Sequence, residues 1–258
     1  MRLAACAEML FTELPFVERV RRIDDLGFDV ELWDSRPKDI PALKATGAVF
    51  SSMTGYSAGS LVDPDTADEV VRTAAELIPT ALELGISRMV VHSAELVDGQ
   101  AARPVFRSTG TMWATGARTL QRLGELGAAH GVTFCLENLN TVLDHPGIPL
   151  ARAKDTRALV EAAGHPSARM MLDLYHAQLG EGNLIELLRS SLPFVGEVQV
   201  ADVPGRCEPG TGEINYAAVH RALADAGYTG TVGMEAWASA DSEAALAAFR
   251  GAFSPSAA

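Results

Sequence analysis

Residues 131–140 read GVTFCLENLN, an apolar run that stops abruptly at an acid. The segment from 132 to 136 carries no charge and is typical of a buried strand. Glu137 follows it directly, and burying a carboxylate is unfavourable unless the group lies at an open end with a partner. The stretch therefore predicts a strand that ends in a polar site.

The same pattern recurs three times downstream. MMLD ends at Asp173, GEVQVAD carries Gln199 and Asp202, and TVGMEA contains Glu235. Four successive strands that each present an oxygen side chain at or near one end predict a single oxygen-lined site.

Strand-like and helix-like segments alternate along the whole chain. We expect strands at 3–7, 28–33, 48–53, 87–92, 132–137, 169–173, 195–201 and 231–235. We expect helices at 16–26, 40–45, 63–84, 111–130, 155–163, 184–191, 216–226 and 243–253. Eight such units favour an α/β fold, a single (β/α)8 TIM barrel domain over 1–258. A doubly wound open sheet is the alternative, but no GxGxxG follows a strand.

Three local features refine this prediction. Asp63 is the expected N-cap of the helix over 63–84, with Pro64 at its first position. Pro79 should kink or break that helix. The polar connection over 95–110 is longer than usual, and connections of that length often act as lids.

Composition narrows the functional class. The 258 residues include 48% hydrophobic and 21% charged residues, and the formal net charge is -12. That charge disfavours nucleic acid as a partner. No apolar run approaches the roughly 20 residues that cross a bilayer, so we expect no membrane span. Three cysteines without metal-type spacing fit a reducing compartment, and we expect a cytoplasmic protein.

In a barrel, the carboxyl ends of all strands meet around one mouth. Glu137, Asp173, Gln199 and Glu235 then become neighbours. Three carboxylates packed together need a cation between them, and an all-oxygen set favours Mg²⁺ or Mn²⁺. Any one of these side chains alone could instead cap a helix or pair with a cation, but four at equivalent positions weaken that reading.

Other polar residues are candidates for substrate contacts. His176 lies three residues past Asp173 and should face the same mouth. Arg206 could hold a carboxylate with its planar fork, or it could be a solvated loop cation. His92 and Trp33 end predicted strands and should line the cavity, although either could be an ordinary core residue. Glu213 could join the site or simply favour the N-terminus of the next helix.

Several motifs carry a resemblance to a known family. DLYHAQ at 173–178, QVADVPGR at 199–206 and EPGTGEINY at 208–216, with LENLN and GMEA, resemble the hydroxypyruvate isomerase family. That family belongs to the xylose-isomerase-like superfamily of (β/α)8 sugar isomerases and epimerases. The resemblance covers nearly the whole chain and is densest from 131 to 237. Residues 31–37 and 93–112 depart from it, which leaves the exact substrate open.

The resemblance implies a divalent metal held by Glu137, Asp173, Gln199 and Glu235, with the two glutamates as the acid/base pair. His176 and Arg206 match substrate-contacting positions of related epimerases. The implied reaction is an aldose–ketose isomerisation of a small molecule, hydroxypyruvate to tartronate semialdehyde, by proton transfer through a cis-enediolate. Barrels of this family often associate, so a homo-oligomer is a possible assembly.

Three other functions remain as alternatives. A ketose 3-epimerase would use the same residues and metal but reprotonate the same carbon from its other face. An endonuclease of the superfamily needs a histidine-rich trinuclear zinc site and a positive groove, which six histidines and a net charge of -12 do not favour. A non-catalytic sugar-binding barrel is the third.

Overall fold

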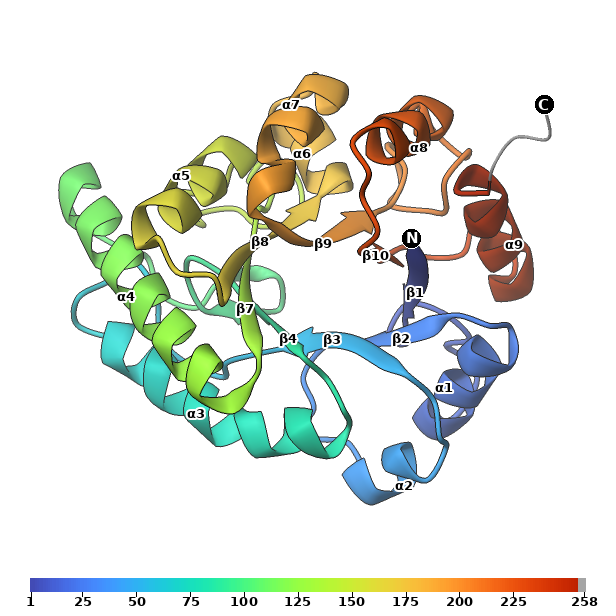
Figure 1. Ribbon diagram of the computed structural model, residues 1–258, viewed down its shortest axis with the longest axis horizontal. Coiled ribbons are helices and arrows are strands. Elements are labelled where there is room, and N and C mark those ends of the chain that lie inside the picture. Colours follow the sequence, from blue (N-terminus) through green and yellow to red (C-terminus); the bar gives the residue numbers. More distant parts are fainter. Residues whose placement is uncertain (255–258) are drawn as a thin grey trace.

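The computed structural model describes residues 1–254 and shows a closed barrel of eight parallel strands (Figure 1). In hydrogen-bonded order the strands are β1 (Arg2–Cys6), β10 (Thr231–Met234), β9 (Val195–Val200), β8 (Ala168–Asp173), β7 (Thr133–Glu137), β4 (Arg88–Val91), β3 (Phe50–Thr54) and β2 (Asp29–Leu32). Because β1 pairs with both β10 and β2, the sheet has no free edge. The predicted (β/α)8 barrel is confirmed, and the open doubly wound sheet is wrong.

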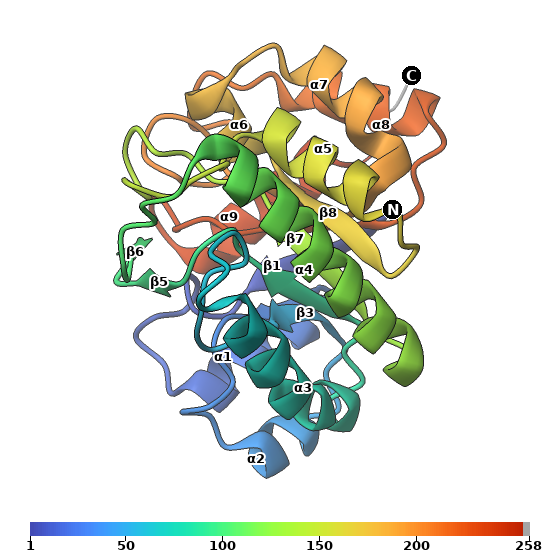
Figure 2. The ribbon, with the colours of Figure 1, turned by 90° about the vertical axis from the view of Figure 1, so that its left-hand side faces the viewer.

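Helices cover the outside of the barrel. They are α1 (Phe16–Asp25), α2 (Ile40–Lys44), α3 (Ala67–Glu83), α4 (Thr109–His130), α5 (Ala153–Ala163), α6 (Leu174–Gly180), α7 (Leu184–Ser191), the 3₁₀ turn η1 (Leu192–Phe194), α8 (Tyr216–Asp225) and α9 (Ser242–Ala252). Figure 2 shows α3 and α4 side by side along one flank. Within residues 1–254, no helix combines the length and the apolar character that a membrane crossing requires.

The helix after β3 differs from the prediction at two points. It begins at Ala67, with Thr66 rather than Asp63 at the cap position, because Oδ1 of Asp63 already accepts from the Asp65 amide and from Arg107. The helix also runs unbroken through Pro79. Seven buried side chains hold α3 against the barrel, which outweighs the one backbone hydrogen bond that proline removes.

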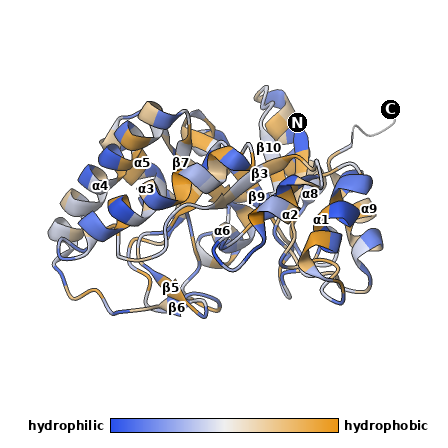
Figure 3. Ribbon diagram, turned by 90° about the horizontal axis from the view of Figure 1, so that it is seen from below, coloured by the Kyte–Doolittle hydropathy of each residue, from blue (hydrophilic) through white to orange (hydrophobic). Residues whose placement is uncertain are grey.

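Two short elements were not expected. The connection over 95–110 contains a small antiparallel hairpin, β5 (Leu96–Val97) and β6 (Gln100–Ala101). Figure 3 shows this hairpin apart from the barrel strands, at one end of the molecule. α6 begins directly after β8, because the Asp173 carboxylate accepts a hydrogen bond from the backbone amide of His176 and caps the helix.

Apolar packing between strands and helices builds the core. On α4, Leu120 and Leu123 are fully buried in the same cluster as Phe134 of β7 and Leu159 of α5. Burying such a side chain contributes roughly 1.5–3 kcal/mol, so this layer fixes the direction of β7 and therefore of Glu137 at its end.

Candidate active site

One cavity of about 790 Å³ opens at the carboxyl ends of the barrel strands. Seven of the eight predicted site residues line it: Trp33, His92, Glu137, His176, Gln199, Arg206 and Glu235. The eighth, Asp173, is 1% exposed and lies behind the wall, in contact with His176. The fold therefore gathers all eight predicted residues in one place.

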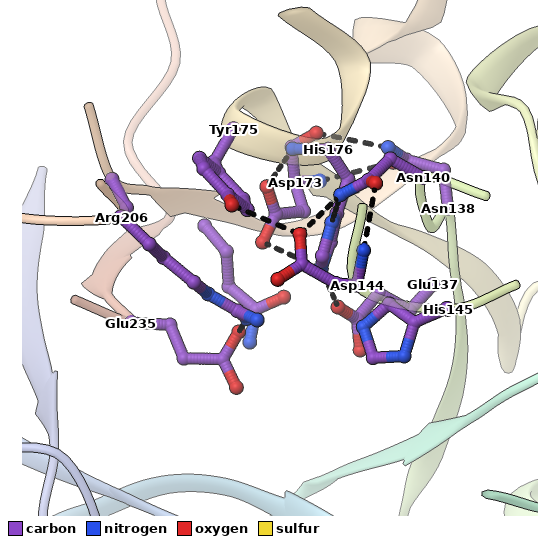
Figure 4. A network of polar contacts seen from close by, with 12 residues as sticks. Glu137, Asn138, Asn140, Asp144, His145, Asp173, Tyr175, His176, Arg206 and Glu235 are labelled. Atoms are coloured by element: carbon purple, nitrogen blue, oxygen red, sulfur yellow. Dashed lines mark hydrogen bonds and ion pairs between the residues drawn. The ribbon is translucent and has the colours of Figure 1, made fainter. Parts of the chain in front are cut away.

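The acids converge from three strands, β7, β8 and β10, of which β7 and β8 are paired and β9 separates β8 from β10. Glu137 is the last residue of β7, Asp173 is the last residue of β8, and Glu235 follows β10 directly. With His176, each offers one potential ligand atom, and these four atoms all lie within 4.8 Å of one another. Figure 4 shows the four side chains turned toward a common centre.

Two donors hold the carboxylate of Glu235. Nε1 of Trp33 donates to Oε1 at 2.6 Å, and Nη2 of Arg206 donates to Oε2 at 2.6 Å (Figure 4 shows the second contact). The Arg206 guanidinium also lies over the ring of Tyr175, 5.1 Å from its centroid. Burial opposes the charged form of Arg206, but the carboxylates of Glu235 and Asp173 outweigh it and raise the pKa of this group.

The charges of the cluster do not balance. Glu137, Asp173 and Glu235 face one guanidinium, that of Arg206. Burial raises the pKa of Glu137 well above its ordinary value, and the nearby Glu235 raises it further. The pKa of Asp173 is raised by burial and then by Glu137. Two uncompensated negative charges in a buried cluster are what a divalent cation would neutralise.

The donor set fits a hard divalent cation. It consists of carboxylate oxygens. Within residues 1–254, four buried side-chain atoms of cavity-lining residues also have no hydrogen-bond partner: Oε2 of Glu31, Nε2 of His176, Oε1 of Gln199 and Nε of Arg206. An amide oxygen and carboxylates suit Mg²⁺ or Mn²⁺, whereas an imidazole nitrogen would favour softer metals.

Hydrogen bonds decide which nitrogen of His176 carries its proton. Oδ1 of Asn140 accepts from the amides of Leu143 and Asp144, so its NH₂ group faces Nδ1 of His176 at 2.7 Å. Nδ1 must then accept, which leaves the proton of the neutral ring on Nε2. Burial lowers the pKa of His176 well below its ordinary value, and the positive charge of Arg206 lowers it further. His176 is therefore a neutral donor, and this favours a substrate contact over a metal ligand.

His92 supports Glu137 from the opposite side. Its Nε2 lies 3.1 Å from Oε2 of Glu137, and its Nδ1 lies 3.1 Å from the hydroxyl of Tyr56. That hydroxyl donates to the carbonyl of Ala94, so it accepts from Nδ1 of His92. Burial lowers the pKa of His92 to about 4. Because the proton of this neutral ring lies on Nδ1, Nε2 can only accept, so its contact with Glu137 is a hydrogen bond when that carboxyl group is protonated. The raised pKa of Glu137 agrees with this arrangement.

Some sequence interpretations fall outside the site. Asp202 does not line the cavity; its carboxylate accepts from the amides of Val203, Gly210 and Ile214 and holds the loop after β9. Glu213 is exposed and accepts from Gln178. An acid near a strand end can thus serve the following loop instead of the cavity, as Asp202 does.

Other site residues were missed, and Glu31 is the most informative. It lies inside β2, is 2% exposed, and accepts from Nε2 of Gln199 at 2.5 Å. The sequence did contain a signal for Glu31, because an acid within the apolar run FDVELW resembles the pattern at Glu137. Asn140 stands within the quoted stretch itself, but its role depends on His176, which lies on another unit of the barrel. Tyr56 and Trp237 also line the cavity. They lie on loops, whose course cannot be predicted from the periodicity of apolar residues.

Comparison with known proteins agrees with this geometry. A parallel barrel whose strand ends gather acids around one cavity is the architecture of a small-molecule enzyme. Residues 15–252 match the family described as xylose isomerase-like TIM barrel, and the chain belongs to that family. Relatives named as isomerases match it closely enough to place it among the isomerases as an enzyme.

Two sequence relatives illustrate the match. A 2-oxo-tetronate isomerase of Haemophilus influenzae is 31% identical over 250 residues, covering 91% of this chain and 92% of that protein. A putative hydroxypyruvate isomerase of Homo sapiens is 41% identical over 101 residues, which span 39% of this chain and 36% of the human protein.

Solved structures share the fold. A protein described as AP endonuclease, family 2, from Brucella melitensis superposes with a TM-score of 0.83 at 27% identity, covering 97% of this chain and 98% of that one. A D-psicose 3-epimerase from Clostridium cellulolyticum superposes with a TM-score of 0.81 at 20% identity, over 99% and 100% of the two chains. At that identity the second match shows the fold alone.

Proposed function

We propose that this protein is a metal-dependent isomerase that moves a proton between adjacent carbons of a small α-hydroxy carbonyl compound. Hydroxypyruvate, interconverting with tartronate semialdehyde, is the first substrate to test. The convergence of Glu137, Asp173 and Glu235, with one atom of each inside a 4.8 Å cluster, carries the proposal. The names of the isomerase relatives support the choice of substrate.

Glu137, Asp173, Gln199 and Glu235 would hold the cation, Mg²⁺ or Mn²⁺. When bound, such an ion polarises a carbonyl group and makes the neighbouring C–H bond more acidic. Gln199 belongs in this set because its Oε1 is buried and has no hydrogen-bond partner among residues 1–254.

Glu137 and Glu235 would carry the proton. One of them removes the hydrogen from the carbon that bears the hydroxyl. The electron pair of that bond forms a carbon–carbon double bond, while the π pair of the carbonyl group moves onto its oxygen. The same or the other glutamate then returns a proton to the former carbonyl carbon, and the hydroxyl proton passes to the other oxygen as the new carbonyl group forms. Trp33 and Arg206 keep the carboxylate of Glu235 in one orientation, which favours repeated transfer along the same path.

His176 and Arg206 would bind the oxygen atoms of the substrate. Nε2–H of His176 faces the cluster and can donate to an oxygen on which negative charge develops. Nε of Arg206 is buried and has no hydrogen-bond partner in the described part of the chain, so one side of its fork is available for a carboxylate. Trp33 and His92 line the remaining wall.

A ketose 3-epimerase is the second candidate, and the size of the cavity favours it. A volume of about 790 Å³ lies within the range of pockets that hold drug-sized ligands, well above the needs of a three-carbon acid. In that reaction the two glutamates would act on opposite faces of one carbon.

Incubation in D₂O followed by NMR tests both candidates. The Mn²⁺-loaded protein would be mixed separately with hydroxypyruvate and with a set of free ketoses. The isomerase predicts deuterated tartronate semialdehyde, and the epimerase predicts a deuterated sugar with one inverted centre. A loaded protein that introduces no deuterium into any of these compounds would contradict the proposal.

A further inference from the structure

A buried hydrogen bond crosses the barrel interior between two residues of the cavity wall. Nε2 of Gln199 donates to Oε1 of Glu31 at 2.5 Å, and the two residues are 1% and 2% exposed. Both line the same cavity. They come from β9 and β2, which are separated by β10 and β1 (Figure 1). The contact is therefore made across the barrel and not between paired strands.

Gly233 of β10 makes this contact possible. It lies in register with Gln199 of β9 on one side and with Ala4 of β1 on the other. A Cβ atom at 233 would lie 2.7 Å from Oε2 of Glu31 and 3.9 Å from Cγ of Gln199. The first distance is shorter than van der Waals contact, so any side chain here would displace the carboxylate of Glu31. The glycine leaves the space through which Glu31 reaches Gln199.

The partner fixes the direction of the Gln199 amide. The oxygen atoms of a carboxylate accept hydrogen bonds, so Glu31 selects the NH₂ end of the amide and turns Oε1 the other way. Oε1 is buried, and none of the residues that the structure describes makes a hydrogen bond to it. An amide that rotated by half a turn would instead present NH₂, which cannot bind a cation.

We propose that Glu31 is a positioning residue that orients Gln199 so that Oε1 serves as a ligand for the divalent cation. This inference rests on the proposed metal dependence. Partners of this kind typically change metal affinity by about 10- to 100-fold when they are removed. The hydrogen bond that Glu31 accepts comes from Gln199 and not from a catalytic group.

The test measures Mn²⁺ binding by the full-length protein, with the electron paramagnetic resonance signal of free Mn²⁺ as the readout. In Glu31→Leu nothing accepts from Gln199, so Mn²⁺ should bind about 10- to 100-fold more weakly. Glu31→Gln retains an acceptor oxygen and should stay within a few-fold of wild type. In a Gln199→Leu background, Glu31→Leu should have no further effect, because Glu31 acts through that amide.

Glu208→Gln is the matched control. Glu208 lies on the loop after β9, is 7% exposed, does not line the cavity, and accepts from the backbone amide of Ser239. Its replacement should leave Mn²⁺ affinity unchanged. If Glu31→Leu does not fold, Gly233→Ala takes its place, because the added methyl group displaces the Glu31 carboxylate.

The outcomes separate the two proposals. The positioning role alone would be overturned if Glu31→Leu bound Mn²⁺ with wild-type affinity. It would also be overturned if Glu31→Leu lowered the Mn²⁺ affinity equally in the wild-type and the Gln199→Leu backgrounds. A wild-type protein that binds no Mn²⁺ would overturn the proposed function and this role together.

Discussion

The amide nitrogen of Asn140 lies 2.7 Å from Nδ1 of His176, inside the buried wall of the cavity. Asn140 cannot turn its oxygen toward the ring, because that oxygen accepts from the amides of Leu143 and Asp144. The consequence is a neutral His176 with its proton on Nε2, ready to donate to the substrate.

Asn140→Asp should reverse this tautomer. The substitution is made together with Asp144→Asn, because Nδ2 of Asn140 also donates to Oδ2 of Asp144 at 2.6 Å and two carboxylates there would repel each other. An aspartate oxygen would then accept from the ring, which moves the proton to Nδ1 and leaves Nε2 without a donor hydrogen. The ¹⁵N NMR signals of His176 should exchange their protonated and unprotonated shifts, and kcat should fall. Asn215→Asp makes the same change at the cap of α8, where an acid accepts equally well from Ala218, and should alter neither property. An unchanged His176 spectrum in the variant that combines Asn140→Asp with Asp144→Asn would refute the assignment.

Glu235→Gln should abolish turnover and preserve the fold. The amide keeps the shape of the side chain but cannot remove a carbon-bound proton. We expect activity to drop by at least about 100-fold, within the range for lost general-base catalysis. Glu213→Gln, at an exposed residue that does not line the cavity, should retain full activity. Circular dichroism checks the fold of both variants, and normal turnover in Glu235→Gln would exclude its role.

Arg206→Lys should distinguish an acidic substrate from a neutral one. Lysine keeps the charge but loses the planar fork that binds a carboxylate in two places. For hydroxypyruvate, KM should rise about 10- to 100-fold, which corresponds to the loss of a charged hydrogen bond. For a neutral ketose the rise should be much smaller. Equal effects on both substrates would mean that Arg206 acts mainly by holding Glu235.

Stabilisation by metal should increase with pH. Folding raises the pKa of Glu137 and of Asp173, chiefly through burial, so without metal the folded protein binds more protons at these groups than the unfolded chain does. That contribution to stability is complete below the ordinary carboxyl pKa of about 4 and is lost as the pH rises through the raised values. A cation replaces those protons and therefore binds more tightly at higher pH.

The measurement is the difference in melting temperature between Mn²⁺-loaded and EDTA-treated protein, recorded at several pH values from 5.5 to 8. The difference should grow with pH. His92, with its pKa lowered to about 4 by burial, works in the opposite direction: its contribution is lost as the pH falls below about 6.5. That loss affects both samples, so subtraction removes most of it. A difference that does not change with pH would contradict carboxylate ligation.

The barrel could be predicted because its signals are local. The run ending at Glu137 and its repeats at Asp173 and Glu235 each combine an apolar strand with a terminal acid, and barrel closure brings these ends together. Relationships across the barrel could not be predicted in this way. The contact from Glu31 to Gln199 depends on the space above Gly233, and the tautomer of His176 depends on a side chain 36 residues away.

The central claim is that the strand-end acids hold a divalent ion and make a C–H bond of the substrate labile. The most direct test is the rate of solvent deuterium incorporation into hydroxypyruvate and into ketoses, measured by NMR before and after EDTA treatment. We predict exchange into at least one substrate by the Mn²⁺-loaded protein, its loss on chelation and its return when Mn²⁺ is restored. Exchange that continues unchanged after the metal is removed would contradict the account.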